Sequence, residues 1–172
     1  LSSSLNEILG TLAGNSEFAD EQTQKESWKE EIRILKEVLK PYDGSIYFEY
    51  AIPRMGKRID VLVIIQSIIF ILEFKVGEKE YPAYAVDQVM DYALDLKNFH
   101  ETSHDKLIAP ILVATQAKQS DLTIAMTPHD DQILLPIRTN EELLGDSIKS
   151  VLNLWGDDQP IEIANWEQGR YH

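Results

Sequence analysis

Three residues near the centre of the chain combine the side-chain types that metal-assisted hydrolysis needs. Asp60 is followed, after twelve intervening residues, by Glu73, and Lys75 lies two residues further on. Carboxylate oxygens are ligands that Mg²⁺ prefers, and the ion keeps waters for a substrate. A bound divalent metal lowers the pKa of water and neutralises phosphate charge, and a lysine beside it orients the water or stabilises the transition state. If the fold brings these residues together, they predict hydrolysis of a phosphodiester.

Two predicted β-strands position these residues, one over Arg58–Ile65 and one over Ile68–Lys75. Alternate side chains of a strand point to opposite faces. One face of this hairpin is wholly apolar and is expected to be core: Ile59, Val61, Val63, Ile65, Ile68, Phe70, Leu72 and Phe74. The other face is apolar near the turn and charged at the open end. A symmetric turn places Asp60 opposite Glu73 on this second face, with Cβ atoms about 5 Å apart.

Directly opposed carboxylates predict a cation between them. Like charges opposite each other destabilise a sheet, and burial increases the cost unless one group is protonated or a cation intervenes. A divalent metal ion resolves the conflict between Asp60 and Glu73. The alternative is an ion-pair cluster at the end of an ordinary hairpin, which a Glu-x-Lys motif on its own would favour. Gln66-Ser67 is also not a favoured two-residue turn, so the register rests on the symmetry of the turn.

The preceding helix, predicted over about Gln22–Leu39, carries an acidic residue on its apolar side. On a helical wheel of about 100° per residue, Glu31 falls inside the apolar stripe, whereas Glu30 faces water. The stripe consists of Trp28, Ile32, Leu35, Val38 and Leu39. A carboxylate on a buried face needs a partner. That partner is either an arginine, Arg54 or Arg58, or the metal, which would make Glu31 a further ligand.

The following helix, predicted over Tyr84–Phe99, carries a polar pair on the flank of its apolar stripe. Gln88 and Tyr92 are four residues apart and stack on one side of the helix, with Asp95 one turn further. A Gln-x-x-x-Tyr pair is a weak signal alone. It gains meaning from following Glu-x-Lys by a short distance, and we expect Gln88 and Tyr92 to position the strand that is cut.

The net charge of −13 argues against a nucleic-acid ligand, because phosphate contacts require lysine and arginine. The clustering of several cations in one short segment weakens that argument. Arg54, Lys57 and Arg58 fall within five residues, and we expect them to hold phosphates. The alternative is that this cluster is ordinary solvated surface.

The remaining predicted elements complete an α/β fold. A weak leading helix covers residues 1 to about 20, and strands cover Ser45–Ile52, Leu107–Thr115 and Gln132–Ile137, before a helix over Glu141–Asn153. The resulting order predicts a mixed central sheet flanked by helices. The length of 172 residues suits one domain.

Composition narrows the classes of protein. The chain contains no cysteine, which excludes disulfides, cysteine zinc sites and thiol nucleophiles and fits a reducing compartment. The longest apolar run, Val61–Leu72, is broken by two polar residues and is too short to span a bilayer. No segment with the pattern of a signal peptide opens the sequence. We therefore expect a cytoplasmic protein with no membrane partner.

The pattern of Asp60 followed by Glu73-Phe74-Lys75, with the acidic helix before it, resembles the PD-(D/E)XK nuclease superfamily. The trailing Gln88-x-x-x-Tyr92 pair is similar to the RecB-type branch of that superfamily. The resemblance spans about residues 26 to 115, with Ile59 in place of the proline that gives the motif its name. It implies a restriction-endonuclease-like core in the order α-β-β-β-α-β. It also implies a metal-dependent nuclease whose substrate is DNA or, less readily, RNA.

The resemblance assigns roles to individual residues. The lysine that corresponds to Lys75 is catalytic. The cofactor is Mg²⁺ or Mn²⁺, held by three carboxylates and one backbone carbonyl: those of Glu31, Asp60, Glu73 and Phe74.

Three longer stretches are similar to the N-terminal part of a Schlafen-like DNA/RNA helicase family: Ile52–Asp60, Leu72–Gly77 and Leu96–His100. This similarity implies that residues 116 to 172 form an extension leading to a helicase motor in a longer chain. The sequence holds no Gly-x-x-x-x-Gly-Lys-[Ser/Thr] phosphate loop, so we expect the motor to be missing here. If the domain does not cut, the alternative is a nucleic-acid-binding module of a helicase-type protein.

His100 and His104 are four residues apart, a spacing that binds zinc on a helix. No cysteine is present, and no acidic residue is clearly placed as a third ligand. We favour the alternative, that both are histidines of a loop or a helix end.

Overall fold

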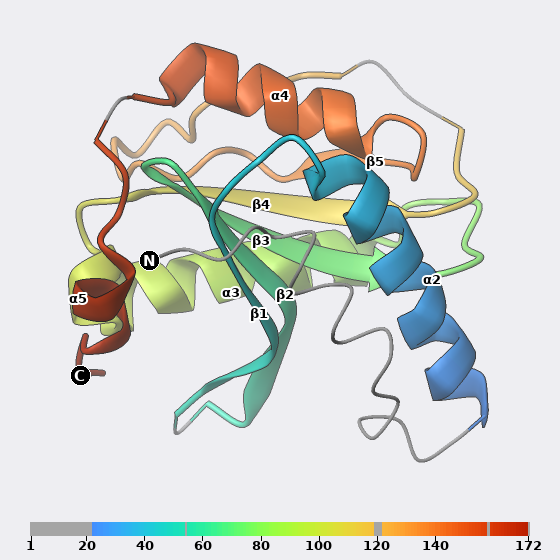
Figure 1. Ribbon diagram of the computed structural model, residues 1–172, viewed down its shortest axis with the longest axis horizontal. Helices are drawn as coiled ribbons and strands as arrows, with labels where there is room; N and C mark the ends of the chain where they lie inside the picture. Colours follow the sequence, from blue (N-terminus) through green and yellow to red (C-terminus); the bar gives the residue numbers. More distant parts are fainter. Residues whose placement is uncertain (1–21, 54, 119–121, 158, 172) are drawn as a thin grey trace.

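The computed structural model describes residues 22–53, 55–118, 122–157 and 159–171. The predicted leading helix and Arg54 lie outside these residues. The helices and strands in chain order are α2 (Gln22–Leu39), β1 (Ser45–Ile52), β2 (Lys57–Ile65), β3 (Ile68–Lys75), α3 (Ala83–Phe99), the 3-10 helix η1 (Glu101–Ser103), β4 (Leu107–Ala114), β5 (Ile137–Thr139), α4 (Leu144–Trp155) and α5 (Ile163–Glu167) (Figure 1).

The strands form a mixed five-stranded sheet in the order β1-β2-β3-β4-β5. The pairs β1–β2 and β2–β3 are antiparallel, whereas the pairs β3–β4 and β4–β5 are parallel. A parallel neighbour requires a crossover connection, which α3 supplies between β3 and β4. The predicted α/β fold with a mixed sheet is confirmed, and the core follows the order α-β-β-β-α-β.

Helices cover both faces of the sheet (Figure 1). On one face, α2 and α4 contribute Leu35 and Ile148 to a single apolar core. On the other face, α3 and α5 contribute Val89 and Trp166 to a second core. β4 is buried along its whole length, as expected of a strand covered on both sides. Among the described helices, none combines the length and the apolar character that crossing a membrane requires.

The β2–β3 hairpin has the predicted register. Its ladder partners run from Val61 with Leu72 to Ile65 with Ile68. The first turn residue, Gln66, adopts the left-handed conformation, with a φ of 54°. Because two-residue hairpin turns need positive φ, this conformation explains how a tight turn forms without asparagine or glycine.

One predicted core residue lies on the other side of the sheet. Ile59 packs in the core beneath α3, whereas Val61, two residues along, packs beneath α2 and α4. The prediction that both share one apolar face is therefore wrong for Ile59. In the neighbouring β1, Glu49 adopts a left-handed backbone with a φ of 51°. The side-chain alternation of both strands shifts at Glu49 and Asp60, while the partners on either side stay in register.

The predicted strand Gln132–Ile137 is wrong in its bounds. The strand β5 covers Ile137–Thr139, and Ile133 and Leu134 form isolated bridges instead. Pro136 has no N–H for a sheet ladder, so regular pairing begins after it.

The helix predicted over Glu141–Asn153 begins later, at Leu144. The Asn140 side chain accepts a hydrogen bond from the Leu143 N–H at 2.9 Å, and this holds residues 141–143 in a turn before the helix. The other predicted strands and helices of the described chain agree with the structure to within one residue at each end. The short helix α5 was not predicted.

Candidate active site

The β2–β3 ladder ends where the predicted acidic pair begins. Val61 and Leu72 are its last partners, and beyond them β3 continues beside β4. Asp60, on the separating strand, accepts a hydrogen bond at Oδ2 from the Phe74 N–H, at 3.1 Å. The Asp60 carboxylate, in place of a backbone carbonyl of β2, thus accepts the hydrogen bond from the Phe74 N–H. The strands separate at the residues that are expected to do the chemistry.

Glu73 is held in its uncharged form. It is only 4% exposed, and burial raises its pKa well above the usual range. A hydrogen bond to the Asp60 carboxylate and the negative charges of Asp60 and Glu31 raise that pKa further, while the Lys75 ammonium opposes them. Two carboxyl groups this close share one proton. Glu73 therefore keeps its proton at neutral pH.

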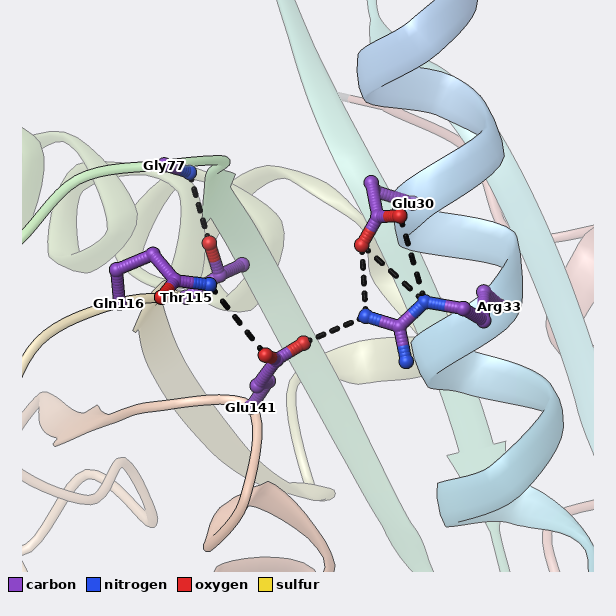
Figure 2. Close-up of polar contacts among 6 residues, drawn as sticks. All are labelled: Glu30, Arg33, Gly77, Thr115, Gln116 and Glu141. Atoms are coloured by element: carbon purple, nitrogen blue, oxygen red, sulfur yellow. Dashed lines mark hydrogen bonds and ion pairs between the residues drawn. The ribbon is translucent and has the colours of Figure 1, made fainter.

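Glu31 reaches the same cluster from α2. Burial, followed by the charges of Asp60 and Glu49, raises the pKa of Glu31 to about 8. Its neighbour Glu30 lies at the surface and binds the Arg33 guanidinium at 2.6 Å (Figure 2). These positions agree with the helical wheel, which placed Glu31 on the buried side and Glu30 in water.

A further carboxylate, that of Glu49, joins the cluster and was missed from the sequence. The β1–β2 ladder pairs Phe48 with Val61 and Tyr50 with Ile59, so Glu49 and Asp60 lie on neighbouring strands between these two pairs. Burial and the Asp60 charge raise the pKa of Glu49, and the Arg58 charge opposes them. The sequence offered no clear signal for it, because the predicted strand bounds differ from the observed ones by one residue at Lys57 and would have placed Glu49 opposite Val61.

Lys75 ends β3 two residues beyond Glu73. Its charge acts to lower the pKa of Glu73, so the ammonium is within electrostatic reach of the acidic pair. The ammonium also lies 5.4 Å from the centroid of the Tyr84 ring, which is a cation–π contact. Because Tyr84 is 64% exposed, an aromatic surface open to solvent borders the lysine.

Gln88 and Tyr92 lie on α3 and bind each other. Gln88 Nε2 donates a hydrogen bond to Tyr92 Oη at 2.8 Å. Burial, followed by the charges of Glu73 and Asp60, raises the pKa of Tyr92 to about 12. The Tyr92 hydroxyl therefore borders the carboxylate cluster from α3, whereas Glu31 borders it from α2.

The residues predicted to hold phosphates differ in their surroundings. Arg54 lies outside the described residues. Lys57 forms an ion pair with Asp95 of α3 at 3.2 Å, so its ammonium is shared with a carboxylate. Arg58 is exposed, and its charge acts on Glu49. Arg58 is therefore the better placed of the two described residues to meet a phosphate.

The donor set fits a hard divalent cation in its chemistry, because Glu31, Glu49, Asp60 and Glu73 offer carboxylate oxygens alone. Burial, followed by the neighbouring negative charges, raises the pKa values of three of them, Glu31, Glu49 and Glu73. Within the described ranges, however, no three His, Asp or Glu side chains stand grouped so that they could hold a metal ion. Asp60 and Glu73 are instead bound to each other through a proton that a cation would displace.

His100 and His104 lie away from this cluster. His100 Nδ1 is 2.7 Å from Ser103 Oγ, and its ring packs against Trp166. Burial, followed by the nearby His104, lowers the pKa of His100 to about 4. His104 Nδ1 donates a hydrogen bond to the Lys97 carbonyl. These contacts favour the interpretation of both as structural histidines at a helix end.

No family model and no curated protein matches this sequence. Among solved structures, the chain is similar to the small subunit of the heterodimeric restriction endonuclease R.BspD6I, with 14% sequence identity and a TM-score of 0.39. The similarity covers 94% of this chain and 85% of that chain. It is a distant likeness in the arrangement of helices and strands.

Proposed function

We propose that the protein is a metal-dependent nuclease that hydrolyses phosphodiester bonds, those of DNA in preference to RNA. The observation that carries the proposal is the carboxyl pair of the partly buried Asp60 and the buried Glu73, which lies where β2 and β3 separate and within reach of the Lys75 charge. A buried acidic pair destabilises a fold unless a ligand compensates it. The resemblance to the PD-(D/E)XK superfamily supports the same function.

Each residue of the cluster has a role in this mechanism. Glu31, Asp60, Glu73 and the Phe74 carbonyl would hold Mg²⁺ or Mn²⁺, and the Phe74 N–H fixes the orientation of the Asp60 carboxylate. When bound, the metal lowers the pKa of a water and neutralises phosphate charge. Lys75 stabilises the negative charge that develops on the phosphate in the transition state.

The surrounding residues would bind and orient the substrate. Gln88 and Tyr92 border the cluster from α3 and position the strand to be cut. Arg58 binds a phosphate, together with Arg54 and with Lys57 once Lys57 exchanges its aspartate partner for the substrate. The exposed carboxylate of Glu49, on the strand beside Asp60, can accept a proton released during hydrolysis.

A cleavage assay with the purified chain tests the proposal. Labelled single- and double-stranded DNA and RNA are incubated in Mn²⁺ and, separately, in EDTA. We expect cleavage in Mn²⁺ and none in EDTA, with DNA cut faster than RNA. Lys149→Gln, an exposed change on α4, is the matched control and should cleave like the wild type. A chain that cuts none of the four substrates in Mn²⁺ would contradict the proposal.

A second candidate is a non-catalytic nucleic-acid-binding module that serves a helicase motor in a longer chain. The observation that favours it is that Asp60 and Glu73 are bound to each other, and that no described trio of acidic or histidine side chains is placed for a metal. Calorimetry with Mn²⁺ separates the two candidates. A nuclease binds the ion and loses that binding on Asp60→Asn, whereas a binding module shows no such site.

A further inference from the structure

A basic cavity of about 700 Å³ opens beside the carboxylate cluster. Its lining consists of Lys79, Glu80, Tyr81, Gln116, Lys118 and Arg138. Three of these residues are cations and one is an acid, in a chain whose net charge is −13. The lining therefore has the opposite sign to the molecule as a whole, and it contains none of the residues that the sequence suggested as phosphate ligands.

The topology places this cavity close to Lys75. The parallel strands β3, β4 and β5 end at the same edge of the sheet, and ligands of open α/β sheets bind beyond the carboxyl ends of the strands. The Thr115 N–H donates to the Lys75 carbonyl at 3.2 Å, and the Gln116 N–H donates to the Glu78 carbonyl at 3.0 Å. Gln116, which lines the cavity, thus bonds at this strand end to Glu78, and Glu78 is next in the chain to Lys79, another lining residue.

Hydrogen bonds fix the wall of the cavity on the side of the active site (Figure 2). The Gly77 N–H donates to Thr115 Oγ1 at 2.7 Å, which holds the turn after β3 against the end of β4. Gln116 Nε2 donates to Glu141 at 3.4 Å. Glu141 in turn binds the Arg33 guanidinium of α2 at 2.7 Å. The turn that carries Lys79 is therefore tied to the strand ends and, through Glu141, to α2.

The cations lie around a tyrosine. The Tyr81 hydroxyl donates to the Lys118 carbonyl at 3.4 Å, and the Arg138 charge acts on the same phenol. Lys79 and Lys118 are exposed, so both ammonium groups can reach a ligand in the cavity. Spaced cations beside hydrogen-bond donors are what a phosphodiester backbone recognises, without regard to base sequence.

We propose that this cavity binds the sugar–phosphate backbone of the nucleic-acid strand on one side of the bond to be cut. The inference rests on the proposed function for the identity of its ligand, a nucleic acid, and not for cleavage. The strand passes the Lys75 end of β3 and enters the cavity, where Lys79, Lys118 and Arg138 contact its phosphates. This track holds the substrate in place while the carboxylate cluster acts on it.

Fluorescence anisotropy with labelled oligonucleotides in EDTA tests the proposal independently of cleavage. The variant carries Lys79→Gln and Lys118→Gln, and the control carries the same charge change on the exposed Lys40 and Lys149. We expect the affinity of the variant to fall and the slope of log K against log salt to shrink by about 1.4 for single strands and about 1.8 for duplexes. The control should keep the wild-type slope.

Each outcome decides the proposal. It is overturned if the variant keeps the affinity and slope of the control, or if the wild type binds no oligonucleotide. Calorimetry with inorganic phosphate forms a separate arm, in which loss of phosphate binding with unchanged oligonucleotide binding would assign the cavity to a free anion. If the wild type cuts nucleic acid and the variant binds it as tightly as the control does, the track is refuted and the proposed function is not. If the variant binds more weakly than the control and the wild type cuts no substrate, the track is supported and the proposed nuclease activity is refuted.

Discussion

Glu73 is buried beside a second carboxyl group, and its raised pKa makes the stability of the metal-free protein depend on pH. Above pH 4.5, the ordinary pKa of the side chain, the folded state keeps a proton that the unfolded state has released. The free energy of unfolding therefore falls as the pH rises from 4.5 towards the folded pKa. Glu31 acts in the same direction up to about pH 8.

We expect Glu73→Gln to remove much of this dependence. The amide N–H replaces the O–H in the hydrogen bond to Asp60, and the new group cannot ionise. In EDTA the variant should melt close to the wild type near pH 5 and at least about 3 °C higher near pH 8, which corresponds to roughly 1 kcal/mol for a chain of this size. Glu30→Gln, at the surface, should gain nothing at pH 8. Parallel melting profiles for all three proteins would contradict a raised pKa at Glu73.

Replacing Lys75 distinguishes an enzyme from a binding module. Lys75→Met keeps much of the length and the apolar stem of the side chain but deletes the charge. Turnover should fall at least about a hundredfold, the usual order for losing one preorganised charge at a transition state. Mn²⁺ should still bind, since lysine is no ligand, and oligonucleotide affinity should drop by one phosphate contact at most. Single-turnover cleavage and calorimetry measure these quantities. Equal cleavage by variant and wild type would place the catalytic centre elsewhere.

At the scale of the elements, α2 decides which of two adjacent acids faces the carboxylate cluster. Its apolar stripe packs Leu35 into the core and carries Glu31 to the carboxylate cluster, while Glu30 binds Arg33 at the surface. We expect Glu31→Gln to abolish cleavage in Mn²⁺ and Glu30→Gln to leave the rate nearly unchanged. The opposite pattern would mean that the wrong face of α2 has been assigned to the site.

Hydrophobic periodicity was sufficient to predict most elements. The bounds of α2, β1 and β3 are those expected, because each has a long apolar repeat at the helical or strand period. The β2–β3 register also follows from the sequence, since a symmetric turn at Gln66-Ser67 fixes the partners on either side of it. From that register alone, Asp60 and Glu73 could be placed across from each other.

The shift in β1 could not be predicted, because it depends on a residue far along the chain. Tyr47 and Tyr50 both pack their rings against Trp166 of α5. Residues three apart on a regular strand point to opposite faces, so both can reach one indole only if the alternation breaks between them. It breaks at Glu49, with its left-handed backbone. The same shift accounts for Ile59 in the second core and for Glu49 in the carboxylate cluster.

Over the whole molecule, the distribution of charge favours one direction of approach. The net charge of −13 repels nucleic acid from most of the surface, whereas the cavity at the carboxyl ends of β3, β4 and β5 is rich in cations. If the chain binds nucleic acid as proposed, we expect the polyanion to approach the edge of the sheet that also holds Lys75.

If the acidic cluster binds a metal ion as proposed, that binding is coupled to the stability of the folded chain. An ion that binds the folded chain alone raises the free energy of unfolding by about 2.7 kcal/mol at a free concentration of 100 times its Kd. Because the ion must displace protons from Glu73 and Glu31, its affinity should rise between pH 6 and pH 8. We therefore expect Mn²⁺ to raise the melting temperature more at pH 8 than at pH 6.

Asp60→Asn and Glu30→Gln show whether this stabilisation arises at the cluster. Asp60→Asn removes a carboxylate from the acidic pair and should weaken Mn²⁺ binding at least about tenfold, which lowers the stabilisation at a fixed ion concentration by about 1.4 kcal/mol. Glu30→Gln makes the same change of charge at the surface of α2 and should keep the wild-type shift. Thermal melts with and without Mn²⁺ at both pH values measure the effect. If Asp60→Asn is stabilised as much as the wild type, the ion binds elsewhere on the acidic surface, and Asp60 and Glu73 do not form a metal site.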